Sequence, residues 1–328
     1  MPNRRTETER NGCPGLYTQL SIFTGNANPR LAEEICAELG IALGQAEVFQ
    51  FSNENIFVKI IDRVREHDVY VVQPFSSPVN VSIMELLIML DALKRASAAR
   101  ITAVIPYYAY GRTDKKDQPR VPITARLLAD LVTAAGANRV LTMTLHAPQI
   151  QGFFDIPVDE LSALPILSHY FADKHLEDWV VIAPDLGAAK RARNFAQRIN
   201  ASLAVIEKRR LGNLERSEVL NVIGEVRGRR AIIFDDEIDT AGSVTGAARV
   251  AEAAGARELY VACTHGILSG PAIERLQNSA IREVVITNTV PLPPQKQIPK
   301  ITALSVAPLF ADGIHRIHTG GSVGALFR

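Results

Sequence analysis

The sequence predicts an α/β protein made of two similar halves, each with a mainly parallel sheet flanked by helices. Short β-branched runs alternate with longer segments whose apolar residues recur at helical spacing. This alternation is typical of parallel sheets whose strands are joined by helices. The pattern occurs on both sides of a polar break at Asp159–Leu164, and 328 residues are enough for two domains.

Eight short apolar runs are predicted to be buried strands, three before the polar break and five after it. In chain order they are Val69–Gln73, Ile101–Ile105, Arg139–Leu145, Val180–Ala183, Leu203–Ile206, Ala231–Phe234, Leu259–Cys263 and Glu283–Thr287.

Four segments between these runs have an apolar face of 3.6-residue period and are predicted to be helices. They are Ile83–Ala99, Ile123–Ala135, Ala188–Ile199 and Val244–Ala254. Gly136 and Gly255 follow two of them, where a glycine often ends a helix. The first of the four is apolar on most sides, so we expect it to be buried or to lie in a subunit interface.

Composition argues against several classes of function. The formal net charge is only +1, and no basic stripe interleaved with aromatic residues is present, so we expect neither nucleic acid nor membrane as a partner. Three cysteines without CxxC spacing suit a reducing, cytoplasmic location. Residues 1–16 lack an apolar core segment and are expected to be a disordered lead-in, not a secretory signal.

The most informative segment is Ala231–Gly246, AIIFDDEIDTAGSVTG, predicted to be a strand, a loop beginning at Asp235 and the start of a helix. The free N–H groups of a helix N-terminus favour an anion such as phosphate. Asp235 and Asp236 would repel a phosphate but suit a sugar diol and a Mg²⁺ shell. The residues expected to wrap the phosphate are Asp239, Thr240, Ala241, Gly242 and Ser243. The alternative is a solvated acidic turn with ordinary helix capping.

The run DDEIDTAGS resembles the PRPP-binding loop of type I phosphoribosyltransferases and of ribose-phosphate pyrophosphokinases (PRPP synthetases). Other segments resemble only the second family, from about Tyr17 to Phe327. They are IPYYAYGRTDKK (105–116), LHAPQIQGFFDIPVDEL (145–161), PDLGAAKRAR (184–193), EKRR (207–210) and LSVAPLFADGIHRIH (304–318). The resemblance implies two tandem phosphoribosyltransferase-like domains, with ribose 5-phosphate held by the acidic run.

The resemblance assigns a second phosphate loop to Pro184–Lys190, which would hold the diphosphate being transferred. Its residues are Asp185, Leu186, Gly187 and Ala188, with Asp185 on Mg²⁺. Taken alone, this segment has the alternative interpretation of a plain strand-to-helix turn. The family usually has glycine at the position of Ala188, so we expect a slightly reshaped loop.

His146, at the end of a predicted strand, corresponds to a histidine that contacts metal and ATP in the family. An aspartate usually precedes it, but here Thr144 and Leu145 do, so one carboxylate is missing or displaced. Lys208 and Arg210 correspond to the catalytic cations of a mobile lid. Without the resemblance, the histidine would be interpreted as structural and the cations as a solvated surface.

The expected ATP-binding residues depart most from the family pattern. They are Phe51, Asn53, Asn55, Arg112 and Thr113, together with His146. Phe51 can stack on adenine and Arg112 can bind phosphate in a bidentate manner. Asparagines replace two family carboxylates, and Thr113 replaces a glutamine. An alternative for Phe51 is a plain core aromatic residue.

The resemblance implies transfer of the diphosphate of ATP to ribose 5-phosphate, with Mg²⁺ as cofactor. The substitutions in the ATP segments leave open a non-catalytic regulatory paralogue. A phosphoribosyltransferase is a third hypothesis, which the duplicated domain and the PDLGAAK segment disfavour.

The family pattern also predicts the larger organisation. We expect an N-terminal domain at 17–160, a C-terminal domain with the ribose 5-phosphate site at 161–304, and a tail at 305–328 that packs back on the first domain. The resemblance implies a homo-oligomer, typically a hexamer, activated by phosphate and inhibited by nucleotide.

Overall fold

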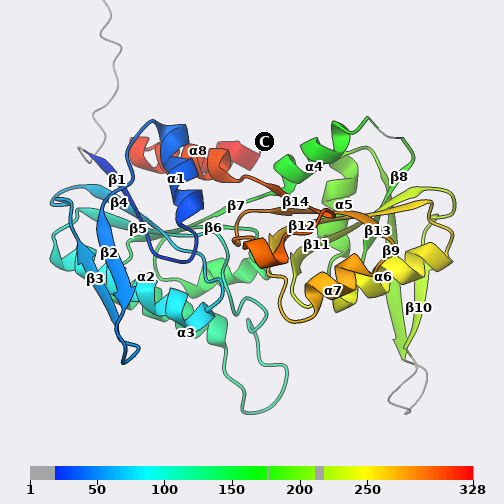
Figure 1. Cartoon of the computed structure of the whole chain (residues 1–328), viewed down its shortest axis with the longest axis horizontal. Coiled ribbons are helices and arrows are strands. Elements are labelled where there is room, and N and C mark those ends of the chain that lie inside the picture. Colours follow the sequence, from blue (N-terminus) through cyan, green and yellow to red (C-terminus); the bar gives the residue numbers. More distant parts are fainter. Residues whose placement is uncertain (1–18, 176, 211–217, 328) are drawn as a thin grey trace, which may run out of the picture.

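The computed structural model describes residues 19–175, 177–210 and 218–327. In these parts the chain forms two α/β halves that lie side by side, each with a central sheet between helices (Figure 1). The predicted α/β class with two mainly parallel sheets is confirmed.

Within the described residues, the first half contains a five-stranded parallel sheet of order β1-β4-β5-β6-β7. Its strands are β1 (Leu20–Thr24), β4 (Asp68–Val72), β5 (Arg100–Ile105), β6 (Arg139–Met143) and β7 (Val158–Leu161). Its helices are α1 (Pro29–Leu39), α2 (Val79–Arg95), α3 (Thr124–Ala135) and a 3₁₀ turn, η1 (Pro148–Phe153). An antiparallel hairpin, β2 (Ala46–Gln50) with β3 (Ile56–Ile60), stands at the outer side of this half (Figure 1).

The second half contains a seven-stranded sheet, as far as the structure describes it, of order β10-β9-β8-β11-β12-β13-β14. All neighbours are parallel except β9 and β10. The strands are β8 (Trp179–Ala183), β9 (Ser202–Arg210), β10 (Glu218–Ile223), β11 (Arg230–Ile238), β12 (Glu258–Gly266), β13 (Ile281–Thr287) and β14 (Ile301–Leu304). The helical elements are α4 (Leu164–Ala172), α5 (Ala189–Arg198), α6 (Gly242–Ala253), α7 (Ala272–Gln277), η2 (Pro294–Lys296), α8 (Ala307–Thr319) and η3 (Val323–Phe327).

Every predicted strand and helix is present, with shifts of a few residues at the ends. The first part of the polar break belongs to a strand, β7, which pairs with β6 through Leu161, and its last residue, Leu164, begins α4. The hairpin is not among the predicted elements, and neither of its short strands strictly alternates apolar and polar residues. Helix α1 is not among the predicted helices, although both of its ends carry clear signals. The Asn28 side chain accepts from the N–H of Leu31 at the start, and Gly40 ends the helix in the left-handed conformation.

Helix α8, at the C-terminal end, returns to the first half and packs on α1 and β7 (Figure 1). Its Phe310 and Ile314 are fully buried in the same apolar cluster as Tyr70. Polar contacts add to this packing: Nδ1 of His318 lies 2.8 Å from Oδ2 of the buried Asp68.

The predicted domain boundaries stay a prediction. Among the described helices, none is both long and apolar enough to cross a membrane.

Candidate active site

Strand β11 continues through Asp235, Asp236 and Glu237 to Ile238. The prediction that a loop begins at Asp235 is therefore wrong. β11 stays paired with β12 through Ile238, whereas its pairing with β8 ends at Ile233. Acidic residues disfavour strands, which is why the sequence indicated a loop, but the ladder to β12 outweighs that preference. The three carboxylates are therefore held on regular backbone at the point where β8 leaves the sheet pairing.

A cavity of about 540 Å³ opens over these carboxylates, and both halves of the chain line it. It brings together segments that the sequence analysis had singled out separately: the Arg112 segment, the His146 segment, the PDLG loop and the acidic run. The lining residues are Arg112, Asp114, Lys115, His146, Ala147, Pro148, Gln149, Asp185, Gly187, Arg191, Asp235, Asp236, Glu237 and Ser243.

Asp236 connects the two halves, with only 1% of its side chain exposed. Its Oδ2 lies 2.7 Å from Nδ1 of His146, and its Oδ1 accepts a hydrogen bond of 2.6 Å from Nη2 of Arg191 on α5. Nη1 of Arg191 donates to the backbone oxygen of His146 at 3.0 Å. We assign the proton of the neutral imidazole to Nδ1, because Nδ1 faces a carboxylate. The other nitrogen, Nε2, then has a free lone pair with which it can bind a metal.

The two adjacent aspartates have opposite pKa shifts. Burial raises the pKa of Asp235, and the charge of Asp236 raises it further. Burial also raises the pKa of Asp236, but the His146 hydrogen bond and the Arg191 charge outweigh it, so this pKa lies below its ordinary value. The same hydrogen bond raises the pKa of His146. The site therefore carries concentrated negative charge that a bound cation would relieve.

Arg112 lies over the acidic strand, where it pairs with Glu237. Its Nη1 also lies 3.8 Å from Oδ2 of Asp239. Burial raises the pKa of Glu237, and Arg112 partly offsets that rise. The hydroxyl of Tyr107 donates to Glu237 at 3.5 Å. The guanidinium is thus half-exposed at the cavity edge, in reach of an anion that enters it.

The predicted phosphate-binding residues form the turn that leads from β11 into α6. Ala241 has φ 60°, in the left-handed region, and α6 starts at Gly242 with no side-chain cap in this described segment. The first N–H groups of the helix are therefore not taken by a capping side chain, and a phosphate can accept from them. Ser243, in the first turn, also lines the cavity.

Neighbouring side chains hold this turn in place. Asp239 accepts a hydrogen bond from the hydroxyl of Ser269. Nη1 of Arg275 donates to the backbone oxygen of Thr240 at 3.0 Å. Both partners belong to the segment between β12 and the end of α7, so the packing of that segment shapes the turn.

The PDLG segment is a turn that opens α5, and Asp185 and Gly187 line the cavity. Oδ1 of Asp185 accepts from the N–H of Ala188 at 2.9 Å. Ala188 has φ −78° and ψ −13°, a conformation that any L-residue adopts, so alanine in place of glycine adds no strain here. Leu186 points outward, with 67% of its surface exposed.

The residues expected to bind adenine do not line this cavity. Phe51, Asn53 and Asn55 lie in the loop of the β2–β3 hairpin, and none of them lines the cavity. Phe51 is 47% exposed and packs edge-on against Phe49, so it is not the plain core aromatic of the alternative hypothesis. Thr113 does not line the cavity either, and its hydroxyl donates to the backbone oxygen of Tyr110. Its neighbour Arg112 does line the cavity.

The backbone of Lys208 and Arg210 belongs to strand β9, whereas a loop was expected from Lys208 onward. β9 continues to Arg210, opposite Glu218 of β10, because the antiparallel partner supplies hydrogen bonds that the sequence analysis did not anticipate. The side chains of both cations, and the rest of the expected lid at 211–217, lie outside the described residues.

Two side chains central to this geometry, Arg191 and Glu237, were not assigned from the sequence. Arg191 follows the PDLGAAK motif directly, and a cation in the first turn of a helix after a phosphate loop was an available signal. Glu237 was counted only as part of the acidic run. Their roles depend on which residues face one another across the two halves. The spacing of residues along the chain does not indicate such contacts.

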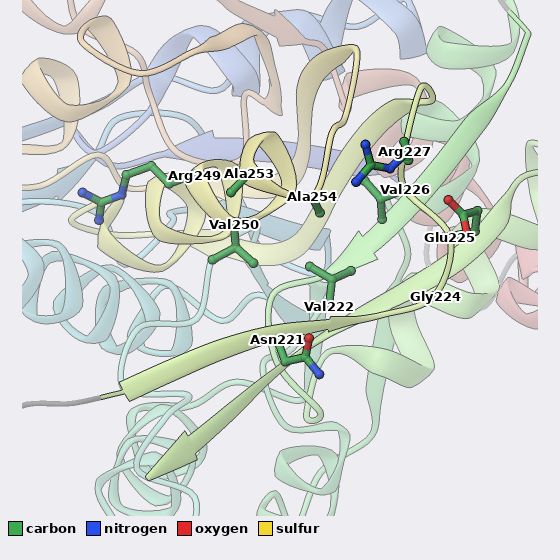
Figure 2. A pocket seen from close by; sticks show the side chains of 10 residues that line it. All are labelled: Asn221, Val222, Gly224, Glu225, Val226, Arg227, Arg249, Val250, Ala253 and Ala254. Carbon is green, nitrogen blue, oxygen red and sulfur yellow. The ribbon is translucent and has the colours of Figure 1, made fainter. Parts of the chain in front are cut away.

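A second cavity, of about 440 Å³, lies between β10 and the C-terminal part of α6 (Figure 2). Val222 and Val250 point into it from opposite sides, and Arg227 and Glu225 lie near its edge (Figure 2). None of the residues predicted for function lines it.

Comparisons with known proteins show the family to which the chain belongs. Residues 20–136 match the model of the N-terminal domain of ribose phosphate pyrophosphokinase, and residues 213–328 match that of the phosphoribosyl synthetase-associated domain. The ribose-phosphate pyrophosphokinase of Caldanaerobacter subterraneus is 58% identical over 95% of this chain and 99% of its own, and that of Clostridium acetobutylicum is 54% identical over 94% and 97%. The crystal structure of phosphoribosylpyrophosphate synthetase from Mycobacterium smegmatis superposes with a TM-score of 0.87, at 43% identity, over 93% of this chain and 100% of that chain.

Fold and site together define an enzyme with two phosphoribosyltransferase-like domains that meet over an acidic strand. Within that class, the chain belongs to the ribose-phosphate pyrophosphokinase family.

Proposed function

We propose that this chain transfers the β,γ-diphosphate of ATP to the anomeric hydroxyl of ribose 5-phosphate, giving PRPP and AMP. The anomeric hydroxyl oxygen attacks the β-phosphorus and gives up its proton to solvent, the bond from that phosphorus to the α,β-bridging oxygen breaks, and AMP leaves. The observation that carries the proposal is the cavity where two phosphate loops, the acidic strand and His146 meet.

In this mechanism, Asp235 and Asp236 orient the ribose hydroxyls, and the turn Asp239–Ser243 holds the 5-phosphate. The loop Asp185–Ala188 holds the diphosphate, and Arg112 exchanges its carboxylate partners for phosphate oxygens. Lys208 and Arg210 close over the transferring group. Positioning and charge neutralisation supply the catalysis, so no covalent intermediate is required.

The donor atoms around the cavity fit a Mg²⁺ ion that arrives with its substrate. No group of three or more His, Cys, Asp or Glu side chains in the described parts is arranged to hold a metal by itself. Mg²⁺ usually keeps several waters and binds through one or two carboxylates plus substrate phosphates. Asp185 and Nε2 of His146 would hold it here, and the ion would neutralise phosphate charge.

We further propose a homo-oligomer, with a hexamer as the expected state, because the hairpin that carries Phe51 does not reach the cavity of its own chain. A second copy would then supply Phe51, Asn53 and Asn55 to the adenine. Phosphate activation, nucleotide inhibition and a cytoplasmic location complete the proposal and rest on the family resemblance and the cysteine pattern.

The first test is direct. The purified protein is incubated with ATP, Mg²⁺ and ribose 5-phosphate, with and without inorganic phosphate, and AMP and PRPP are measured. Sugar-dependent AMP formation supports the proposal. Its absence under both conditions would favour a non-catalytic regulatory paralogue.

A second test concerns the lid. Lys208→Ala should lower kcat by about 10²–10³-fold, because a cation that acts mainly on the transition state is lost. The dissociation constant for ribose 5-phosphate, measured by calorimetry, should change little. Arg209→Ala removes the same charge from the adjacent position and should retain most of the activity. An unchanged kcat in Lys208→Ala would show that the lid is misassigned.

A further inference from the structure

A buried histidine and a partly buried glutamate, from different parts of the fold, hold opposite ends of one peptide group, the one between Thr144 and Leu145. Nε2 of His265, on β12 of the second half, lies 3.0 Å from the backbone oxygen of Thr144. Oε1 of Glu160, on β7 of the first half, accepts from the N–H of Leu145 at 2.8 Å. The next residue is His146, whose ring faces Asp236 in the cavity.

The backbone at this point is strained, which explains why it needs to be held. Thr144 has φ 46°, in the left-handed region that a β-branched residue rarely adopts. β6 ends at Met143, and the turn at Thr144 directs the following residues toward the second half. Such conformations persist where the surroundings constrain them, and they cluster at functional sites.

The proton positions of His265 follow from its partners. A carbonyl oxygen can only accept, so Nε2 carries the proton and donates to Thr144, and Nδ1 accepts from the hydroxyl of Thr289 at 2.9 Å. Burial lowers the pKa of His265, in agreement with a neutral ring. The ring of Tyr107 lies against it, with centroids 5.0 Å apart. The imidazole is thus fixed in one orientation.

Glu160 is fixed in the same way from the other side. Its Oε1 holds the N–H of Leu145, and its Oε2 accepts from Nε2 of Gln151. The carboxylate that the family pattern places before His146 is absent from that position, where Thr144 and Leu145 stand. Glu160 supplies a carboxylate to the backbone of that segment from the neighbouring strand.

We propose that His265 and Glu160 are positioning residues: together they hold the strained Thr144–Leu145 peptide, and through it they set the direction of His146 in the cavity. Because His265 belongs to the second half, the His146 segment of the first half is oriented by the same sheet that carries Asp236. The expected effect on kcat rests on the proposed function, whereas the hydrogen-bond geometry does not depend on it.

The test compares variants that release the peptide with variants that keep its hydrogen bonds. His265→Asn cannot donate to Thr144, whereas the longer amide of His265→Gln can. Glu160→Leu cannot accept from Leu145, whereas Glu160→Gln can. The releasing variants should lower kcat by about 10–100-fold, as is usual for groups that orient a metal-binding histidine, with the KM for ribose 5-phosphate nearly unchanged. The glutamine variants should recover most of the loss.

The double variant His265→Asn/Glu160→Leu separates a shared role from two independent ones. Both changes release the same peptide, so their effects on kcat should be clearly less than multiplicative. The proposal would be overturned by any of three results: losses of kcat that multiply in the double variant, an equal loss of kcat in the asparagine and glutamine variants of His265, or an effect confined to a higher KM. If His265→Asn does not fold, as judged by thermal unfolding, the Glu160 pair carries the same comparison.

Crystal structures of the unliganded variants provide a measurement that does not depend on activity. The contact between Nδ1 of His146 and Asp236 should be lost in His265→Asn and kept in His265→Gln. An unchanged His146 in the releasing variants would refute the positioning role even in an active enzyme. An inactive wild-type protein would instead refute the proposed function and leave this structural comparison intact.

Discussion

At the scale of single residues, the site shows how neighbours in sequence acquire different chemistry from their surroundings. Asp235 and Asp236 are adjacent on one strand, yet burial raises the pKa of the first, while His146 and Arg191 bring that of the second below its ordinary value. Asp236 therefore stays ionised as the shared partner of two segments. Asp235 is the carboxylate whose charge a substrate or cation must stabilise.

Arg191 gives a prediction at this scale, because it contributes both charge and geometry. Arg191→Met leaves Asp236 buried without its cation and should lower the free energy of unfolding by about 3–5 kcal/mol. Arg191→Lys keeps the charge but lacks the two separate nitrogens that contact Asp236 and the His146 carbonyl, so it should retain most of the stability while kcat falls about 10-fold or more. Urea unfolding and steady-state kinetics measure the two effects.

The control is Arg193→Met, which removes the same charge from an exposed position of the same helix. It should leave both stability and kcat nearly unchanged. Full activity in Arg191→Lys would mean that only the charge of Arg191 matters, and not its two-point contact.

At the scale of elements, a polar cluster joins α4 to the edge of the second sheet. Nζ of Lys174, just after α4, lies 2.8 Å from Oε2 of Glu283 on β13, and Thr302 of β14 donates to the same carboxylate at 3.0 Å. Tyr170 of α4 donates to it as well. Burial raises the pKa of Glu283, but these three partners together lower it below its ordinary value.

A group with a lowered pKa stabilises the fold above its unfolded pKa, about 4.3 for glutamate, and loses that contribution as the pH falls through the lowered value. Glu283→Gln should therefore lower the free energy of unfolding by about 1–3 kcal/mol at pH 7. The difference from wild type should shrink as the pH drops below about 4. Urea unfolding across this pH range checks the prediction.

Glu274→Gln, on the exposed side of α7, serves as the control and should show no such pH-dependent difference. A stability loss in Glu283→Gln that is the same at pH 3 and pH 7 would mean that packing, and not the charge of Glu283, holds α4 to the sheet.

At the scale of the whole molecule, several large apolar side chains remain exposed on the first half. Leu127 and Leu131 are four residues apart on α3 and share one face, and Met84 is exposed on α2. α2 and α3 pack together, on the same half as the hairpin that carries Phe51 (Figure 1). This surface supports the proposed association of copies, with the hairpin of one copy serving the cavity of another.

Mixing two impaired variants tests that arrangement. Phe51→Ala impairs the hairpin and Lys208→Ala impairs the lid. If the hairpin acts on a neighbouring copy, co-assembled variants contain some sites with both parts intact, and activity should reappear. Each variant alone, taken through the same dissociation and reassembly, is the control. No recovery in assemblies shown by mass spectrometry to be mixed would place the hairpin and lid of a site on one chain.

Much of the fold and part of the site could be predicted from the sequence, because they rest on local signals. Hydrophobic periodicity and β-branched runs identified eight strands and four helices. The predicted phosphate turn at Asp239–Ser243 does lead into a helix whose first turn lacks a side-chain cap. The end of β11 could not be predicted in this way, because the pairing with β12 overrides the low strand preference of Asp235–Glu237.

By itself, the sequence determined the α/β class, the doubled architecture and the two loops suited to phosphate, since each depends on residues close together in the chain. Only the tertiary structure decided that Asp236 faces His146 and Arg191, that Glu237 faces Arg112, and that the segment expected to bind adenine lies away from the cavity. These relations join residues about 45 to 125 positions apart, and side-chain contacts over such separations are set by how the two halves pack.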